Sequence, residues 1–160
     1  MKLEIKQGIA ENVKHTTSVH GSSHQGTGSV STTNITLFLV NGIQTKMTAR
    51  NPVLIENNDK VYLAGSKNNN GIFNILAYKN LSTQVSERVS IDIWLGMGIS
   101  LILLGILFLS NINFGHSSFS ATFGLISLMC IGIGALLLYK VKIILQAFTV
   151  VRNNESLGLD

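Results

Sequence analysis

The chain has little cysteine, proline and charge, and these shortages exclude several classes of protein. Among 160 residues there is one cysteine, Cys130, so neither an intramolecular disulfide nor a cysteine-based zinc site can form. Its thiol lies in an apolar run, where it is expected to behave as a small hydrophobe. Charged residues make up 12% of the chain, about half the share of a soluble domain, and the mean hydropathy is +0.36. This composition argues against an ordinary soluble enzyme and against disorder, and indicates that part of the chain lies in lipid.

The stretch from Ile93 to Tyr139 contains no charged side chain. It holds two apolar runs, Ile93–Ser110 and Phe119–Tyr139, of 18 and 21 residues. As helices they would be about 27 and 31 Å long, close to the roughly 30 Å thickness of a bilayer's hydrocarbon core. The polar link Asn111–Ser118 is short enough to force an antiparallel hairpin. The sequence therefore predicts a two-helix transmembrane hairpin over residues 91–139.

Cations flank the hairpin on one side only. Arg88 precedes the first span, and Lys140, Lys142 and Arg152 follow the second, whereas the link contains neither Lys nor Arg. The positive-inside rule then places both termini in the cytoplasm of a bacterium, with the chain in the inner membrane and in contact with its lipids. Residues 1–90 begin without a pattern typical of a signal peptide, so we expect them to form a soluble cytoplasmic domain.

Small residues recur within the two apolar runs at helix-packing distances. Gly98 and Gly105 are seven residues apart, Cys130 and Gly134 are four apart, and Ser127 extends the second set. Such positions let two helices approach closely, either within the hairpin or between copies of the chain, although glycine is also simply common in membrane helices. No ionisable group lies in either run, which argues against a proton relay, an ion path or a transporter site.

Residues 1–90 have the composition and turn signals of a β domain. Asn41-Gly42 is the dipeptide most favoured in type I′ hairpins, and Gly21–Gly28 has the composition of a flexible loop. The expected strands are Glu11–His20, Ser29–Val40, Gln44–Thr48, Lys60–Ser66 and Ile72–Lys79. Five short antiparallel strands favour a small closed barrel, because closure removes the exposed edges of a sheet.

Alternation of side chains assigns the last two strands to the two faces of this sheet. Val61 and Leu63 are expected on one face, with Tyr62 and Ala64 on the other. In the following strand, the alternation sets Phe73, Ile75 and Ala77 against Ile72, Asn74, Leu76 and Tyr78.

The run Asp59–Asn80 contains a polar turn, a V-x-L-x-G strand, an Asn-Gly turn and a further strand. This pattern resembles the later strands of OB-fold domains attached to bacterial membrane proteins, over about 50 residues from Thr33 to Thr83. The resemblance implies an OB-like barrel. Two features depart from the pattern: domains of the NfeD type follow their membrane spans, whereas this one precedes them, and the helix of many OB folds has no room between Thr48 and Lys60. An SH3-like barrel is therefore the alternative.

Histidine forms the one cluster with metal-binding chemistry. His15, His20 and His24 lie within ten residues, and imidazole is a ligand for Zn, Cu or Ni. On a strand, His15 and His20 face opposite sides, and the nearest acid is Glu11. The pattern is more typical of polar surface histidines than of a metal site, and we expect no cofactor.

Neither catalysis nor nucleic-acid binding is favoured. The chain contains no Gly-x-Ser-x-Gly, P-loop or His-Glu-x-x-His motif, so we predict no enzyme. Residues 1–90 have nine Lys+Arg and five Asp+Glu, hence a net charge of +4. A single-strand binder also needs exposed aromatic side chains, which this small domain needs for its core. The cations suit an anionic membrane surface better.

The segment 140–160 is predicted to continue the second helix into the cytoplasm, as an amphipathic tail ending near Arg152. Ile144, Phe148 and Val151 share one face of it, and exposing each large apolar side chain would cost about 1.5–3 kcal/mol. The membrane surface, the barrel or another chain must cover this face, which is the candidate interaction site.

The sequence thus favours a non-catalytic inner-membrane protein whose cytoplasmic barrel binds another protein or a second copy. The alternative is a membrane-tethered binder of nucleic acid or a small ligand.

Overall fold

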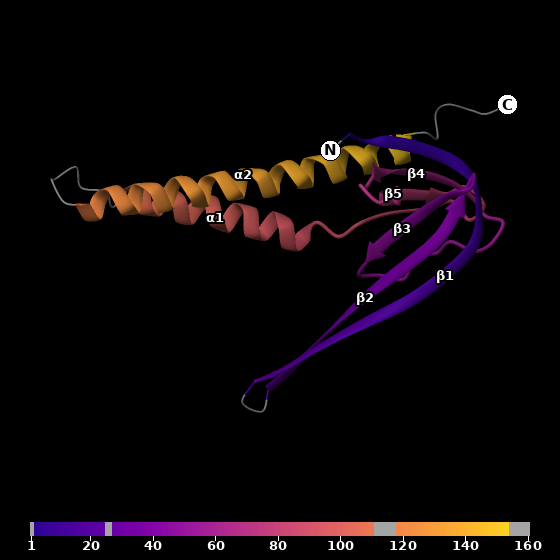
Figure 1. The fold of residues 1–160 in the computed structure, drawn as a ribbon, viewed down its shortest axis with the longest axis horizontal. Coiled ribbons are helices and arrows are strands. Elements are labelled where there is room, and N and C mark those ends of the chain that lie inside the picture. The colour runs from indigo at the N-terminus through magenta and orange to yellow at the C-terminus, as the bar shows by residue number, and fades with distance from the viewer. Residues whose placement is uncertain (1, 25–26, 111–117, 154–160) are drawn as a thin grey trace. The chain divides into compact units, whose positions relative to one another are not determined.

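A computed structural model describes residues 2–24, 27–110 and 118–153, which form six strands and two helices (Figure 1). The strands are β1 (Glu4–His24), β2 (Thr27–Val40), β3 (Ile43–Ala49), β4 (Lys60–Lys67), β5 (Phe73–Asn80) and β6 (Val85–Arg88). The helices are α1 (Asp92–Ser110) and α2 (Ser118–Asn153). The chain divides into two compact units, residues 1–90 with 144–160 and residues 91–143, so α2 contributes to both.

The strands form one sheet in the order β3-β2-β1-β4-β5-β6, in which neighbouring strands are antiparallel. A parallel pairing joins β3 to β5, through Thr45 with Phe73 and Lys46 with Asn74. The hydrogen-bonded ladder that starts at β3 therefore returns to β3 through β5. Residues 50–59, between β3 and β4, contain no helix.

The first hairpin is longer than predicted. Strand β1 begins at Glu4 rather than Glu11, and the loop predicted at Gly21–Gly28 is wrong, because β1 runs to His24 and β2 begins at Thr27. Residues 25–26 of that loop lie outside the described residues. Glycine and serine permit extended backbone as well as turns, and here the ladder continues through them, with Ser22 and Ser29 joined by a 2.9 Å hydrogen bond between their hydroxyls.

Several turns contain residues with left-handed backbone, and two of them bear on the predicted strands. Asn41 and Gly42 have φ angles of 51° and 73°, as the predicted type I′ turn requires. Gln84, with φ of 59°, lies in the turn between β5 and β6. Strand β6 is not among the strands predicted from the sequence, because the turn before it has neither glycine nor asparagine at the left-handed position.

A bulge in β5 changes which side chains enter the main core. Gly65 pairs with Ile75 and Ala64 pairs with Ala77, so Leu76 is an extra residue in β5. Beyond it the predicted alternation is wrong, because Tyr78 joins the core and Ala77 turns to the other face. The main core contains, among others, Phe38, Met47, Ile55, Leu63, Phe73 and Tyr78.

Helices α1 and α2 are each long and apolar enough to cross a membrane. They pack through small residues: the Ser127 hydroxyl donates a 2.6 Å hydrogen bond to the Gly105 carbonyl, and a Cβ added at Gly134 would lie 2.8 Å from the Gly98 carbonyl oxygen. Both contacts belong to one antiparallel register, since seven residues separate each pair along its helix. Cys130 is only half-buried and takes no part in these contacts.

Aromatic contacts mark the two ends of this hairpin. The Lys140 ammonium lies 5.2 Å from the Trp94 ring, and at the other end the Phe108 and Phe123 rings are 5.8 Å apart. Of the predicted link Asn111–Ser118, residues 111–117 lie outside the described residues. The pairing of Trp94 with a lysine suits a bilayer interface, where amphipathic aromatic rings and long cationic side chains gather.

Candidate functional site

The first hairpin extends beyond the rest of the sheet as a two-stranded arm, defined here as His15–His24 of β1 with Thr27–Thr33 of β2. Strand β1 pairs with β4 only over Glu4–Ile9, and β2 pairs with β3 only over Asn34–Val40. Within the arm each strand therefore has one partner and one open edge. Figure 1 shows β1 and β2 extending together beyond the ends of the other strands.

The arm is uncharged and exposed. Between Lys14 and Lys46 the sequence contains no Asp, Glu, Lys, Arg or Pro. Val19 and Val30 are 62% and 74% exposed. Val30 pairs with Gly21, which shares a face with Val19, so the two valines form a small apolar patch on one face of the arm.

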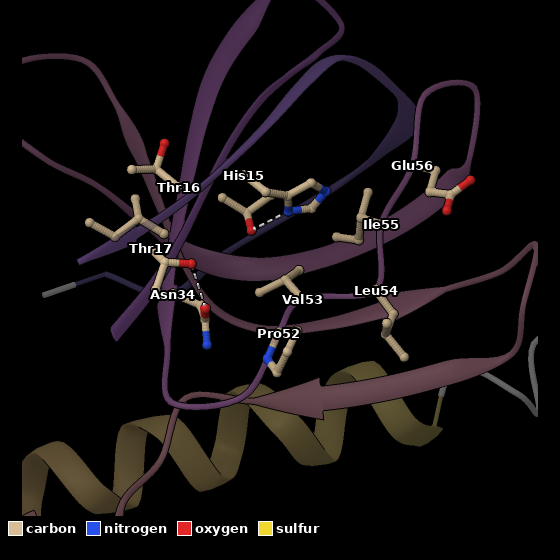
Figure 2. A pocket seen from close by; sticks show the side chains of 11 residues that line it. His15, Thr16, Thr17, Asn34, Pro52, Val53, Leu54, Ile55 and Glu56 are labelled. Atoms are coloured by element: carbon tan, nitrogen blue, oxygen red, sulfur yellow. Dashed lines mark hydrogen bonds between the residues drawn. The ribbon is translucent and has the colours of Figure 1, made fainter. Parts of the chain in front are cut away.

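A pocket of about 380 Å³ lies at the base of the arm (Figure 2). Its walls come from residues 15–17 of β1, residues 34–36 of β2 and the extended segment 52–56. This volume falls in the range of small-molecule sites. His15 and Thr36 are paired across the ladder and both line the pocket. They lie on the same face of the hairpin as Thr17 and Val19, so this face of the arm is continuous with the pocket wall.

Hydrogen bonds hold the polar side chains of the pocket in place. The Nδ1 atom of His15 lies 3.0 Å from the hydroxyl of buried Thr36. The Thr17 hydroxyl donates to Asn34 Oδ1 at 3.2 Å, and Asn34 Nδ2 donates to the Arg50 carbonyl at 2.8 Å. The pocket thus offers an oriented imidazole, an oriented amide and hydroxyl groups.

The segment 52–56 is fixed by two side chains from β5. The backbone N–H of Leu54 donates to the Tyr78 hydroxyl at 3.0 Å, and Asn80 Nδ2 donates to the Leu54 carbonyl at 3.0 Å. Burial is the main cause that raises the pKa of Tyr78 to about 12, so the phenol keeps its proton, which it donates to Glu87 at 3.4 Å. The clamped wall leaves the Leu54 side chain 55% exposed at the pocket.

Of the three candidate metal-binding histidines, the two whose side chains the structure describes, His15 and His20, lie apart. His20 Nε2 lies 3.2 Å from the Ser18 hydroxyl, and the unbroken register places His20 on the face opposite His15. The side chain of His24 lies outside the described residues. Among the side chains that the structure describes, no group of three or more His, Cys, Asp or Glu is placed to hold a metal ion.

Of the three candidate residues of the tail, Val151 and Phe148 pack against the sheet of their own unit. Val151 is fully buried, Ile144 is nearly so, and Phe148 is half-buried. Val151 and Ala147 cluster with alanines of β4 and β5, and the Arg88 guanidinium lies 5.9 Å from the Phe148 ring. Helix α2, predicted to reach Arg152, ends at Asn153. The sequence left the membrane surface, the β domain or another chain as the possible partner of this apolar face. In the structure, strands of the β domain contact much of it.

Comparisons with protein-family models, with curated proteins and with solved structures find no match for this chain.

Proposed function

We propose that this chain is a non-catalytic, membrane-anchored interaction module, in which the two-helix hairpin spans the bacterial inner membrane and the β domain binds a protein in the cytoplasm. The observation that carries the proposal is the arm, an uncharged ribbon with two open edges. Exposed strand edges pair readily with strands of other chains, and many recognition domains bind partners in this way. The lack of a catalytic motif in the sequence supports a binding function.

The pairing pattern supports an OB-like barrel over an SH3-like one. In an OB barrel the first strand pairs with the second and fourth, and the third strand closes on the fifth. The pairings of β1 with β2 and β4, and of β3 with β5, follow this scheme. The helix-free segment 50–59 is then a shortened form of the connection that carries a helix in many such barrels.

The proposed anchor and orientation predict a labelling pattern in intact cells. In a Cys130→Ser background, a cysteine at Ser117 should react with a membrane-impermeant maleimide, because the link between the spans would face outward. A cysteine at exposed Thr83 should react only after the cells are permeabilised. Labelling of Thr83→Cys in intact cells would show that the β domain lies outside the cytoplasm.

The interaction itself predicts position-specific crosslinks. A photoreactive amino acid at Ser31 or Thr32, both exposed on the arm, should give a discrete crosslinked protein product in living cells. The matched control is Thr83, which is also exposed and lies in the turn that follows β5. Products of equal yield from Thr83 and the arm would contradict the proposal, since they would report random collision.

The pocket favours a second candidate, a membrane-tethered binder of a small ligand. Its polar groups are oriented, and Leu54 adds an exposed apolar surface beside them. Such a function predicts that substitutions of His15 or Asn34 change ligand binding and leave the arm crosslinks intact. Nucleic acid is not favoured, because the exposed arm carries no Lys or Arg to neutralise phosphates.

A further inference from the structure

Strand β1 of the arm has a free edge, made of the backbone N–H and C=O groups that point away from β2. The N–H of Val13 donates to Asn57 Oδ1 at 2.9 Å, outside the β1–β2 ladder. Backbone direction alternates along a strand, and the register is continuous from Lys14 to His24. The N–H and C=O groups of alternate residues from His15 to Ser23 therefore point outward, over an edge of nine residues centred on Val19.

The free edge of β2 is shorter. The same alternation directs the backbone groups of Gly28, Val30 and Thr32 away from β1, and from Asn34 onward β3 pairs with this side of β2. The longer edge of β1 offers more hydrogen bonds to an added strand.

Neither edge of the arm carries the features that normally prevent strand addition. Edge strands are usually protected by lysine, proline, bulges or shortness. The one register shift of β1 against β2 lies before Lys14, and no charge or proline follows until Lys46. A two-stranded ribbon is also only marginally stable in water, whereas three or more strands give stability. The arm is thus built in a form that gains from a further strand.

We infer that a second copy of this chain supplies that strand, through antiparallel pairing of β1 with β1 about a two-fold axis near Val19; this rests on the proposed function and names its partner. Two copies of an uncharged arm can approach without electrostatic repulsion. A charged partner, in contrast, would find no opposite charge on the arm to recognise. The symmetric pairing places Val19 beside Val19 of the second copy and covers a side chain that is 62% exposed. Pairing of β1 with β1 is symmetric and ends at two copies. Pairing of β1 with β2 of another copy would instead leave a free edge on each chain and continue as an open assembly.

Two proline variants that face each other in the ladder test this pairing. Val19 is paired with Thr32, and both direct their N–H groups to open edges, so proline at either position removes one outward donor and disturbs the arm similarly. For the full-length chain in detergent, mass photometry should show dimers for the unaltered protein and for Thr32→Pro. Val19→Pro should weaken dimerisation at least tenfold. Dimers of Val19→Pro as stable as those of the unaltered chain would overturn the inference.

A cysteine scan tests the same pairing without proline. In Cys130→Ser chains in native membranes, single cysteines from Thr16 to Ser22 should form intermolecular disulfides with a sharp maximum at Val19 or an adjacent residue. Residues far from a two-fold axis lie too far from their equivalents to form a disulfide. A flat profile, or no disulfide at any position, would overturn the inference. This result would decide the question even if both proline variants were monomeric.

Crosslinks from Gly21, which is exposed on β1 two residues from the proposed two-fold axis, are compared with those from Ser31 and Thr32 on β2 and separate this inference from the proposed function. A product of twice the chain mass supports both. A product with a different protein, together with a monomeric chain, overturns self-pairing and leaves the interaction module standing. No product above the Thr83 control contradicts both.

Discussion

Replacement of Asn80 by alanine is expected to destabilise the β domain by about 3 kcal/mol or more. Asn80 is fully buried and its side chain joins three parts of the domain. Its Nδ2 donates to the Leu54 carbonyl at 3.0 Å and to Asp59 Oδ2 at 2.6 Å. Its Oδ1 accepts from the N–H groups of Ser82 and Thr83 at 2.9 and 3.2 Å. Alanine would leave several polar groups without this partner where water cannot easily replace it.

Thermal unfolding of the full-length chain in detergent, followed by the β-sheet signal in circular dichroism, measures this loss. Asn69→Ala is the matched control, because Asn69 is exposed in the turn between β4 and β5. Its substitution should change the unfolding free energy by less than about 0.5 kcal/mol. Equal effects of the two substitutions would show that the buried amide does not hold the domain together.

Hydrogen exchange gives a local readout of the same change. The Leu54 N–H is bonded to the Tyr78 hydroxyl, and the Leu54 carbonyl to Asn80. Loss of Asn80 should accelerate exchange at Leu54 more than in the middle of β2. The pocket wall at residues 52–56 would then be the first part of the domain to open.

Local chemistry made the helices and one turn predictable. Two long apolar runs bounded by polar residues specify two helices wherever they fold, and the spacing of Ile144 and Val151 extends the second. Asn41-Gly42 specifies its turn because both residues tolerate positive φ. These signals depend on neighbours in sequence alone.

The pocket and the arm depend on long-range pairing, which local patterns do not encode. The bulge at Leu76 reverses the faces of Tyr78 and Asn80, and without it neither side chain would reach the segment 52–56. The glycines and serines of the arm have weak local preferences, so the ladder with β2 decides their conformation. The uncharged stretch between Lys14 and Lys46 was the one signal in the sequence that pointed to the arm.

Replacement of Gly134 by leucine is expected to separate the helices of the hairpin and to destabilise their packing by about 2–3 kcal/mol. A Cβ at Gly134 would lie 2.8 Å from the Gly98 carbonyl oxygen and 2.7 Å from Ile102 Cγ1. The first neighbour is backbone and cannot rotate away, so the helices must move apart. Proteolysis and thermal unfolding of the full-length protein in detergent should both show a looser hairpin.

Gly132→Leu is the matched control, because a Cβ at Gly132 meets nothing within 4 Å. Both variants add the same apolar side chain to α2 and raise its hydropathy equally, so only Gly134→Leu should loosen the hairpin. Ser127→Ala would remove the hydrogen bond to the Gly105 carbonyl, worth about 0.6 kcal/mol within a membrane. Close backbone approach should therefore matter more than this hydrogen bond, and a larger effect of Ser127→Ala than of Gly134→Leu would reverse that order.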